Sequence, residues 1–169
     1  MNNLRREEKE FCEMLNSMKG VILDVCHLFA GHKSEEVEDL FQEITYNLWK
    51  SMHTFRHESD LATWVHQVAF RTARGQYRSH RDKAITCVPI SDELCEKLAE
   101  EPADERVVML YELIGCLDDD EKEIIYYYID GIKQEEIALV TGKTENAVRQ
   151  DIYRIKKKLK KLYENDKDK

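Results

Sequence analysis

Apolar residues recur at spacings of three and four along almost the whole chain, and this periodicity limits the possible folds more than any other feature. Such spacing places apolar side chains on one face of a helix, whereas a half-buried strand would alternate at every second residue. Only two prolines and six glycines interrupt the pattern. The sequence therefore predicts an all-α protein built from amphipathic helices.

Boundary signals divide the N-terminal half into three expected helices. The first is expected over residues 7–30, ending at Gly31. Ser34 is a suitable N-cap for the second, because its hydroxyl can accept a hydrogen bond from a free amide of the first turn. The second helix has an apolar stripe of Val37, Leu40, Phe41, Ile44 and Leu48. After a polar loop over 51–60, a third helix directs inward the side chains of Trp64, Val65, Val68, Ala69 and Ala73.

The regular spacing weakens between residues 79 and 104, where both prolines occur and acidic residues accumulate. Proline lacks the amide hydrogen that a helix interior needs, so this stretch predicts a linker, with a short helix at 92–99. We therefore expect two small helical domains, over 1–80 and 105–164. A linker over 81–104 joins them, and a charged tail follows at 165–169.

Capping and turn signals mark the C-terminal domain. Asp118 and Glu121 have the D-x-x-E form of a capping box, which would begin a helix that ends at Gly131. A short helix is expected over 134–138, followed by a turn at Gly142. Thr144 is a suitable N-cap for the last helix. A short helix, a glycine turn and a second capped helix are typical of a helix-turn-helix.

The last helix has two contrasting faces. Its apolar face is formed by Val148, Ile152, Ile155, Leu159 and Leu162. Its polar face holds Glu145, Asn146, Arg149, Gln150, Tyr153 and Arg154, followed by lysines. Asn, Gln and Arg side chains can pair bidentately with base edges, and lysines can neutralise phosphates. The pattern favours a helix that reads duplex DNA, and the alternative is an amphipathic helix in a partner-binding bundle.

Charge is segregated along the chain, so the net charge of −8 misleads about partners. The window 143–161 holds eight basic and two acidic residues, which gives +6 and leaves −14 for the rest. A second basic window, 71–83, contains Arg71, Arg74, Arg78, Arg81 and Lys83. Basic patches on an acidic body attract phosphates locally, although each could also be a solvated helix face.

Other function classes have little support in the sequence. Five cysteines and six histidines are scattered, without a C-x-x-C pair or a third ligand for His53 and His57. We therefore expect no disulfide framework, no metal and no cofactor. No phosphate loop or nucleophile motif indicates an enzyme. No apolar run reaches the roughly 20 residues that span a bilayer. Residues 1–10 lack a signal-peptide core, so we expect a cytoplasmic protein without membrane insertion.

Two segments of the N-terminal half resemble conserved region 2 of the extracytoplasmic-function group of sigma factors, within the sigma-70 family. The first resembles its D-L-[VF]-Q-E…L-W signature and consists of Asp39-Leu40-Phe41-Gln42-Glu43 followed by Leu48-Trp49. The second resembles its W-L…I-A…R helix and consists of Thr63-Trp64-Val65, Val68-Ala69 and Arg78.

The C-terminal half resembles conserved region 4 of the same family. The matching residues to its L-P…E-I-A…G…T-V-K pattern are Leu117, Glu136-Ile137-Ala138, Gly142 and Val148-Arg149. Together the motifs cover about 21–163, nearly the whole chain. Their order and spacing identify the chain as similar to a two-domain sigma factor.

The resemblance implies promoter-specific transcription initiation with core RNA polymerase, and an anti-sigma factor as a further partner. In the family a ridge of region 2 docks on a coiled coil of the polymerase, and here it matches Asp39, Gln42, Glu43 and Tyr46. Region 2 also handles the melted −10 strand, which here implicates Phe55, Trp64, Arg71, Arg74 and Arg78. Region 4 reads the −35 element, which here implicates Thr144, Glu145, Asn146, Arg149, Gln150, Tyr153 and Arg154.

The chain departs from the family pattern at four positions. Arg71 stands where Asn is usual and Gly75 where Asp is common, both in the helix that handles the melted strand. Asp118 and Ala147 replace the usual Pro and Thr. Phe55 could equally anchor the core. Two other functions stay open: a helix-turn-helix regulator that acts without polymerase, and an interaction protein that mimics a sigma domain.

Overall fold

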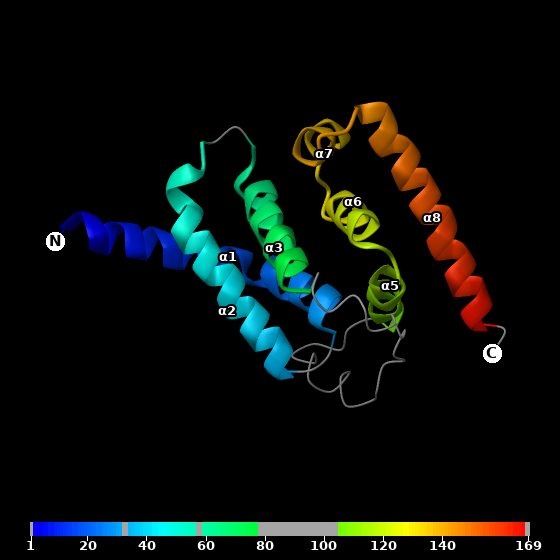
Figure 1. Ribbon diagram of the computed structural model, residues 1–169, viewed down its shortest axis with the longest axis horizontal. Coiled ribbons are helices and arrows are strands. Elements are labelled where there is room, and N and C mark those ends of the chain that lie inside the picture. The colour runs from blue at the N-terminus through cyan, green and yellow to red at the C-terminus, as the bar shows by residue number, and fades with distance from the viewer. Residues whose placement is uncertain (1, 32–33, 57–58, 78–104, 168–169) are drawn as a thin grey trace. The chain divides into compact units, whose positions relative to one another are not determined.

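The computed structural model describes residues 2–31, 34–56, 59–77 and 105–167. Within these ranges the chain forms α-helices and one short 3-10 helix and contains no strand, which confirms the predicted all-α class. The chain divides into two compact units, Met1–His80 and Arg81–Lys169 (Figure 1). The predicted linker, its short helix at 92–99 and Arg78 lie outside the described residues.

The N-terminal unit is a bundle of three helices in which each helix packs against the other two (Figure 1). The helices are α1 (Asn2–Ala30), α2 (Ser34–Ser51) and α3 (Leu61–Tyr77). Most residues of the predicted stripes lie in the core, where Leu40, Ile44, Leu48, Val65 and Ala73 are fully buried. Phe41 and Trp64 are only half-buried. Burying one large aliphatic side chain contributes about 1.5–3 kcal/mol, so each of the buried Leu, Ile and Val residues stabilises the bundle substantially.

Three details of this unit differ from the expectations. Helix α1 begins at Asn2 rather than at residue 7, and α2 includes Ser34 as its first residue. The expected loop over 51–60 begins with a 3-10 helix, η1 (Met52–Thr54). The Ser51 hydroxyl donates to the Asn47 carbonyl at 2.5 Å, and the Thr54 hydroxyl donates to the Ser51 carbonyl at 2.6 Å. Bonds of this kind, from hydroxyl groups to the carbonyls of the preceding turn, often bend a helix, and here they lie where α2 gives way to η1.

The C-terminal unit contains α5 (Glu105–Gly115), α6 (Asp119–Ile129), α7 (Gln134–Thr141) and α8 (Glu145–Lys167). Helix α8 packs against the other three (Figure 1). Its apolar face is buried at Val148, Ile152, Ile155 and Leu159, while Leu162 is half-buried. The largest side chain at the centre is Tyr127, which is fully buried and donates from its hydroxyl to Glu123 Oε1 at 2.9 Å.

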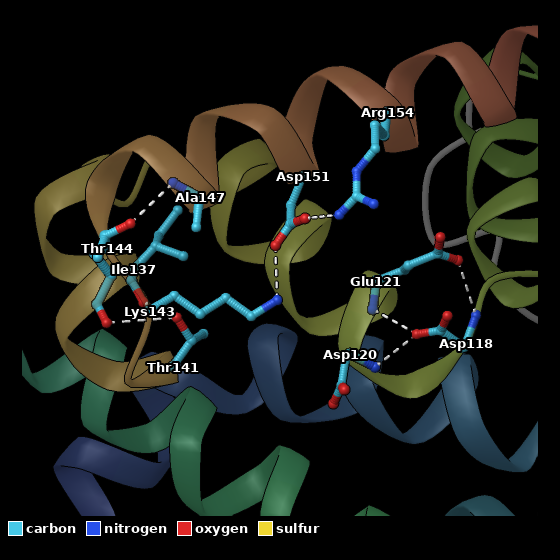
Figure 2. A network of polar contacts seen from close by, with 11 residues as sticks. Asp118, Asp120, Glu121, Ile137, Thr141, Lys143, Thr144, Ala147, Asp151 and Arg154 are labelled. Atoms are coloured by element: carbon cyan, nitrogen blue, oxygen red, sulfur yellow. Dashed lines mark hydrogen bonds and ion pairs between the residues drawn. The ribbon is translucent and has the colours of Figure 1, made fainter.

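The predicted signals at helix ends are confirmed in this unit. Asp118 accepts from the amides of Asp120 and Glu121 at 3.1 and 2.9 Å, and its own amide donates to the Glu121 side chain, which completes the capping box (Figure 2). Helix α7 continues to Thr141, three residues beyond the expected end, because the left-handed turn is at Gly142 (φ +68°). Only glycine adopts this conformation without strain.

Helix α5 is an element that the sequence reasoning missed. Its sequence has five consecutive apolar residues over 107–111, so it lacks the alternation of apolar and polar faces that reveals a surface helix. Among its described side chains, Ile114 is fully buried and Tyr111 lies 6.4 Å from Tyr126 of α6, measured between ring centroids.

Candidate nucleic-acid and partner interfaces

The turn between α7 and α8 is held by local hydrogen bonds. The Lys143 amide donates to the Ala138 carbonyl at 3.0 Å, which closes the end of α7. The Ala147 amide donates to Thr144 Oγ1 at 3.2 Å, so Thr144 is the N-cap of α8 as predicted (Figure 2). Helix α8 therefore leaves the turn in a fixed direction, which a helix that enters a DNA groove requires.

All predicted polar residues at the start of α8 are on its exposed face. These residues are Thr144, Glu145, Asn146, Arg149, Gln150, Tyr153 and Arg154. Tyr153 is 69% exposed although it is aromatic, which makes it a large apolar contact available to a partner. Buried Val148, Ile152 and Ile155 hold the other face, so the polar set is continuous and faces away from the core.

A shallow groove lies beside this face. It is lined by Lys133 and Gln134 at the start of α7 and by Glu145 and Arg149 of α8. Arg149 therefore shares a concave surface with a second cation, Lys133. The sequence reasoning did not select Lys133 or Gln134, because only the turn brings the starts of the two helices together.

A buried carboxylate links the turn to α8. Asp151 accepts from Lys143 Nζ at 2.7 Å through one oxygen and from Arg154 Nη2 through the other (Figure 2). Burial acts to raise the pKa of the Asp151 carboxyl, but the hydrogen bonds and charges of Lys143 and Arg154 outweigh it and hold that pKa below its usual value. Asp151 is therefore ionised at neutral pH.

Two of the lysines that the sequence assigned to phosphate contact are directed to α6. Lys156 Nζ donates to Tyr128 Oη at 2.8 Å and lies 4.1 Å from the centroid of that ring. Lys158 Nζ pairs with Glu121 Oε2 at 2.5 Å. Lys157, between them, is exposed. All three lysines, 156–158, are exposed, and two of them also bind side chains of α6.

In the N-terminal unit, the predicted ridge of α2 is exposed along its length. Asp39, Gln42, Glu43 and Tyr46 are all exposed, Tyr46 by 58%. These four residues form one wall of a groove whose other wall is α3. Asn47 spans the groove, because its amide donates to Glu43 Oε1 at 3.2 Å and to Thr72 Oγ1 at 3.3 Å. The Glu43 bond lies within α2, and the Thr72 bond joins α2 to α3 beside the ridge.

The structure describes four of the five residues predicted to handle the melted strand. Arg71 is exposed and lines the groove opposite the ridge, with Gly75 one turn further along α3. Arg74 is half-buried. Phe55 and Trp64 form a pair whose ring centroids are 5.4 Å apart, and both are half-buried. The structure thus groups Arg71 with the ridge, and the aromatic pair joins the loop to α3. The fifth residue of the set, Arg78, lies outside the described residues.

The described part of the chain contains neither a candidate metal site nor a helix that could span a membrane. In the described residues no cluster of three or more His, Cys, Asp or Glu side chains could hold a metal ion. Burial raises the pKa of the Cys26 thiol to about 12, so that thiol is protonated at neutral pH. No described helix has the length and apolar character needed to cross a bilayer.

Family models match both units. The model of Sigma-70 region 2 matches residues 16–83, and the model of Sigma-70, region 4 matches residues 108–159. A curated relative is the "Probable RNA polymerase sigma factor RfaY" of Xanthomonas campestris pv. campestris, 26% identical over 132 residues. The match covers 69% of this chain, and the chain spans only 31% of the length of that relative.

Two solved structures share the fold. CnrH, solved in complex with the cytosolic domain of CnrY, matches with a TM-score of 0.63 at 24% identity, covering 94% of this chain and 90% of that one. RpoE from Bartonella quintana, solved with the anti-sigma factor NepR, matches with a TM-score of 0.68 at 19% identity, covering 92% and 98%.

Proposed function

Since this chain belongs to the sigma-70 family, we propose that it is a member of the extracytoplasmic-function group, binds core RNA polymerase and directs transcription initiation at specific promoters. The observation that carries the proposal is that regions 2 and 4 occur in one chain, in that order, at residues 16–83 and 108–159. Each region has an exposed polar face. The chain itself catalyses no covalent chemistry in this proposal and acts in the cytoplasm.

The polymerase contact is assigned to the ridge of α2. Asp39, Gln42, Glu43 and Tyr46 are exposed on one helix, and Asn47 fixes that helix to α3. A rigid surface loses little conformational entropy when a partner binds. The acidic groups give the surface a charge that would repel DNA phosphates and would suit a basic protein surface.

The promoter contacts are divided between the units. Domain 1–80 is proposed to bind the melted −10 strand, because aromatic rings and cations hold unstacked bases. Its candidate residues are Phe55, Trp64, Arg71, Arg74 and Arg78. Domain 105–164 takes the −35 duplex through Thr144, Glu145, Asn146, Arg149, Gln150, Tyr153 and Arg154. Arg149 and Gln150 are the candidates for base edges, and Arg154 is nearer to phosphate. Residues 81–104 are proposed to tether the domains.

An anti-sigma factor is the proposed regulatory partner. RpoE of Bartonella quintana was solved with the anti-sigma factor NepR, and CnrH with the cytosolic domain of CnrY. The folds are similar to the fold of this chain over most of its length. We propose that a partner of this class covers the polymerase-binding ridge of α2.

The test is run-off transcription with core polymerase on a library of genomic fragments. Addition of the chain should produce transcripts that start at a small set of sites with a shared −35 and −10 sequence. Core polymerase alone and core polymerase with an Asp39→Lys/Glu43→Lys variant serve as controls and should produce none of these transcripts. The proposal is wrong if the wild-type chain binds core polymerase and yields no site-specific transcript.

A further inference from the structure

Asp151 is the only acidic side chain that is buried among the residues whose burial the structure describes. It lies on α8 between exposed Gln150 and buried Ile152, at the edge between the polar and the apolar face. A charge removed from water is costly unless partners compensate it. A carboxylate at this place therefore requires fixed cations beside it.

The two cations come from different places along the chain. Lys143 belongs to the turn that precedes α8, and Arg154 lies one turn further along α8 (Figure 2). The Lys143 side chain is 36% exposed and that of Arg154 is 75% exposed, while the Asp151 side chain is 10% exposed. The Asp151 carboxylate thus joins the turn to the first half of α8. The Thr144 cap is a second, separate link between the turn and this helix.

This pairing changes the charge that the polar face offers to DNA. Lys143 and Arg154 are two of the eight basic residues in the window 143–161, and both are bound to one internal anion. A cation that is held by a carboxylate releases fewer counterions when it meets a phosphate. Phosphate attraction gives affinity for any sequence, whereas base-edge contacts by neighbouring side chains distinguish sequences.

We propose that Asp151 is a positioning residue for sequence reading, which holds the side chains of Lys143 and Arg154 against α8 and limits non-specific attraction to phosphates. The inference rests on the proposed DNA-binding role of α8. Asp151 itself does not touch DNA in this scheme. Its effect is to set how much of the affinity depends on sequence.

The experiment measures the salt dependence of DNA binding by the full-length chain on a random-sequence duplex. For Asp151→Asn, which keeps the shape of the side chain and removes its charge, the slope of log affinity against log salt should steepen by about 1–2, because two cations become available to phosphates. Affinity for this duplex at low salt should rise. In run-off reactions with core polymerase, the ratio of specific to non-specific transcripts should fall, because attraction to phosphates of any sequence rises while the base contacts stay the same.

Glu164→Gln is the matched control. It raises the charge of the same helix by the same amount, but the Lys160–Glu164 pair that it breaks is exposed, with an N–O distance of 3.9 Å. Such pairs hold their cations weakly, so its slope should equal that of the wild type. In Lys143→Met/Asp151→Asn, one of the released cations is absent and the slope should return by about 1.

The results separate this inference from the proposed function. If Asp151→Asn and Glu164→Gln have the same slope, the inference is overturned, whatever polymerase does. A merely structural role is also recognisable, because it would weaken binding to every duplex without steepening the slope. A wild-type chain that supports no transcription with core polymerase would overturn the proposed function, and the slopes would still decide the role of Asp151.

Discussion

The two units carry their charge in different arrangements. In the N-terminal unit, acidic Asp39 and Glu43 lie across a groove from basic Arg71, so opposite charges face the same space. In the C-terminal unit, three acids occupy the first turn of α6, whereas a run of exposed bases lies along the second half of α8. A grooved surface of mixed charge suits a protein partner, and a protruding helix with excess positive charge suits a polyanion. The net charge of the chain is therefore a poor guide to its partners.

Charge reversal on α2 is expected to have the largest effect, because it should remove polymerase binding and leave DNA binding in place. Asp39→Lys/Glu43→Lys should abolish association with core polymerase, because like charges then meet at the docking surface. Non-specific DNA binding should not be lost. Co-purification with core polymerase measures the effect, and far-ultraviolet circular dichroism checks the helices. The control reverses two exposed acids of α1, Glu8 and Glu13. If the α2 variant still binds core polymerase as the wild type does, the ridge is not the contact.

The independence of the two units can be tested with core cavities. Leu48→Ala should cost about 2–5 kcal/mol of unfolding free energy in the N-terminal unit, because a fully buried side chain is truncated. Amide hydrogen exchange should show lower protection in residues 2–77 only. The reciprocal variant is Ile137→Ala, which should lower protection in 105–167 only. Equal losses in both units would mean that they unfold together and that the comparison describes one body.

The DNA-reading face of α8 is tested by removing one guanidinium. Arg149→Ala should cost about 1–3 kcal/mol of binding free energy and relax specificity at one base pair. Transcription from a panel of −35 variants measures both effects. Lys157→Ala removes an exposed cation of the same helix and should weaken binding equally for all sequences. The assignment fails if Arg149→Ala initiates from the same sites at wild-type strength.

The smallest change in unfolding free energy is expected at the start of α6. Asp118→Ala should cost about 0.5–2 kcal/mol, since it leaves two amides of α6 without their acceptor. Asp118→Asn keeps an acceptor and should lose much less. Denaturant unfolding, followed by hydrogen exchange in 105–167, detects the difference. Equal losses for both variants would assign the effect to charge rather than to the cap.

The sequence predicted best what depends on residues a few positions apart. The Asp118 cap, the Gly142 turn and the Thr144 cap each involve a bond within four residues, and all three are present. Helix α5 escaped because its apolar residues are consecutive and show no helical face. The Lys143–Asp151 pair spans eight residues and a turn, and no local rule connects such positions.

In the N-terminal unit, too, the spacing of residues along one helix predicted some features, whereas others depend on how the helices pack. The exposed ridge of α2 follows from the spacing of polar residues on one helix. The position of Arg71 opposite that ridge depends on how α2 and α3 pack, which spacing along one helix does not specify. For that reason the sequence assigned Arg71 to the melted strand alone, whereas the structure places it beside the proposed polymerase contact.

A gel-shift titration at physiological salt, with and without core polymerase, decides whether the chain needs polymerase to bind its promoter. The DNA is the fragment that gives the strongest run-off transcript. We expect the chain alone to bind this DNA weakly, because each unit offers only a small footprint whose affinity falls steeply with salt. Core polymerase should convert this into tight, sequence-specific binding by holding both units at once. Sub-micromolar, promoter-specific binding by the chain alone would contradict the account and would favour a regulator that acts without polymerase.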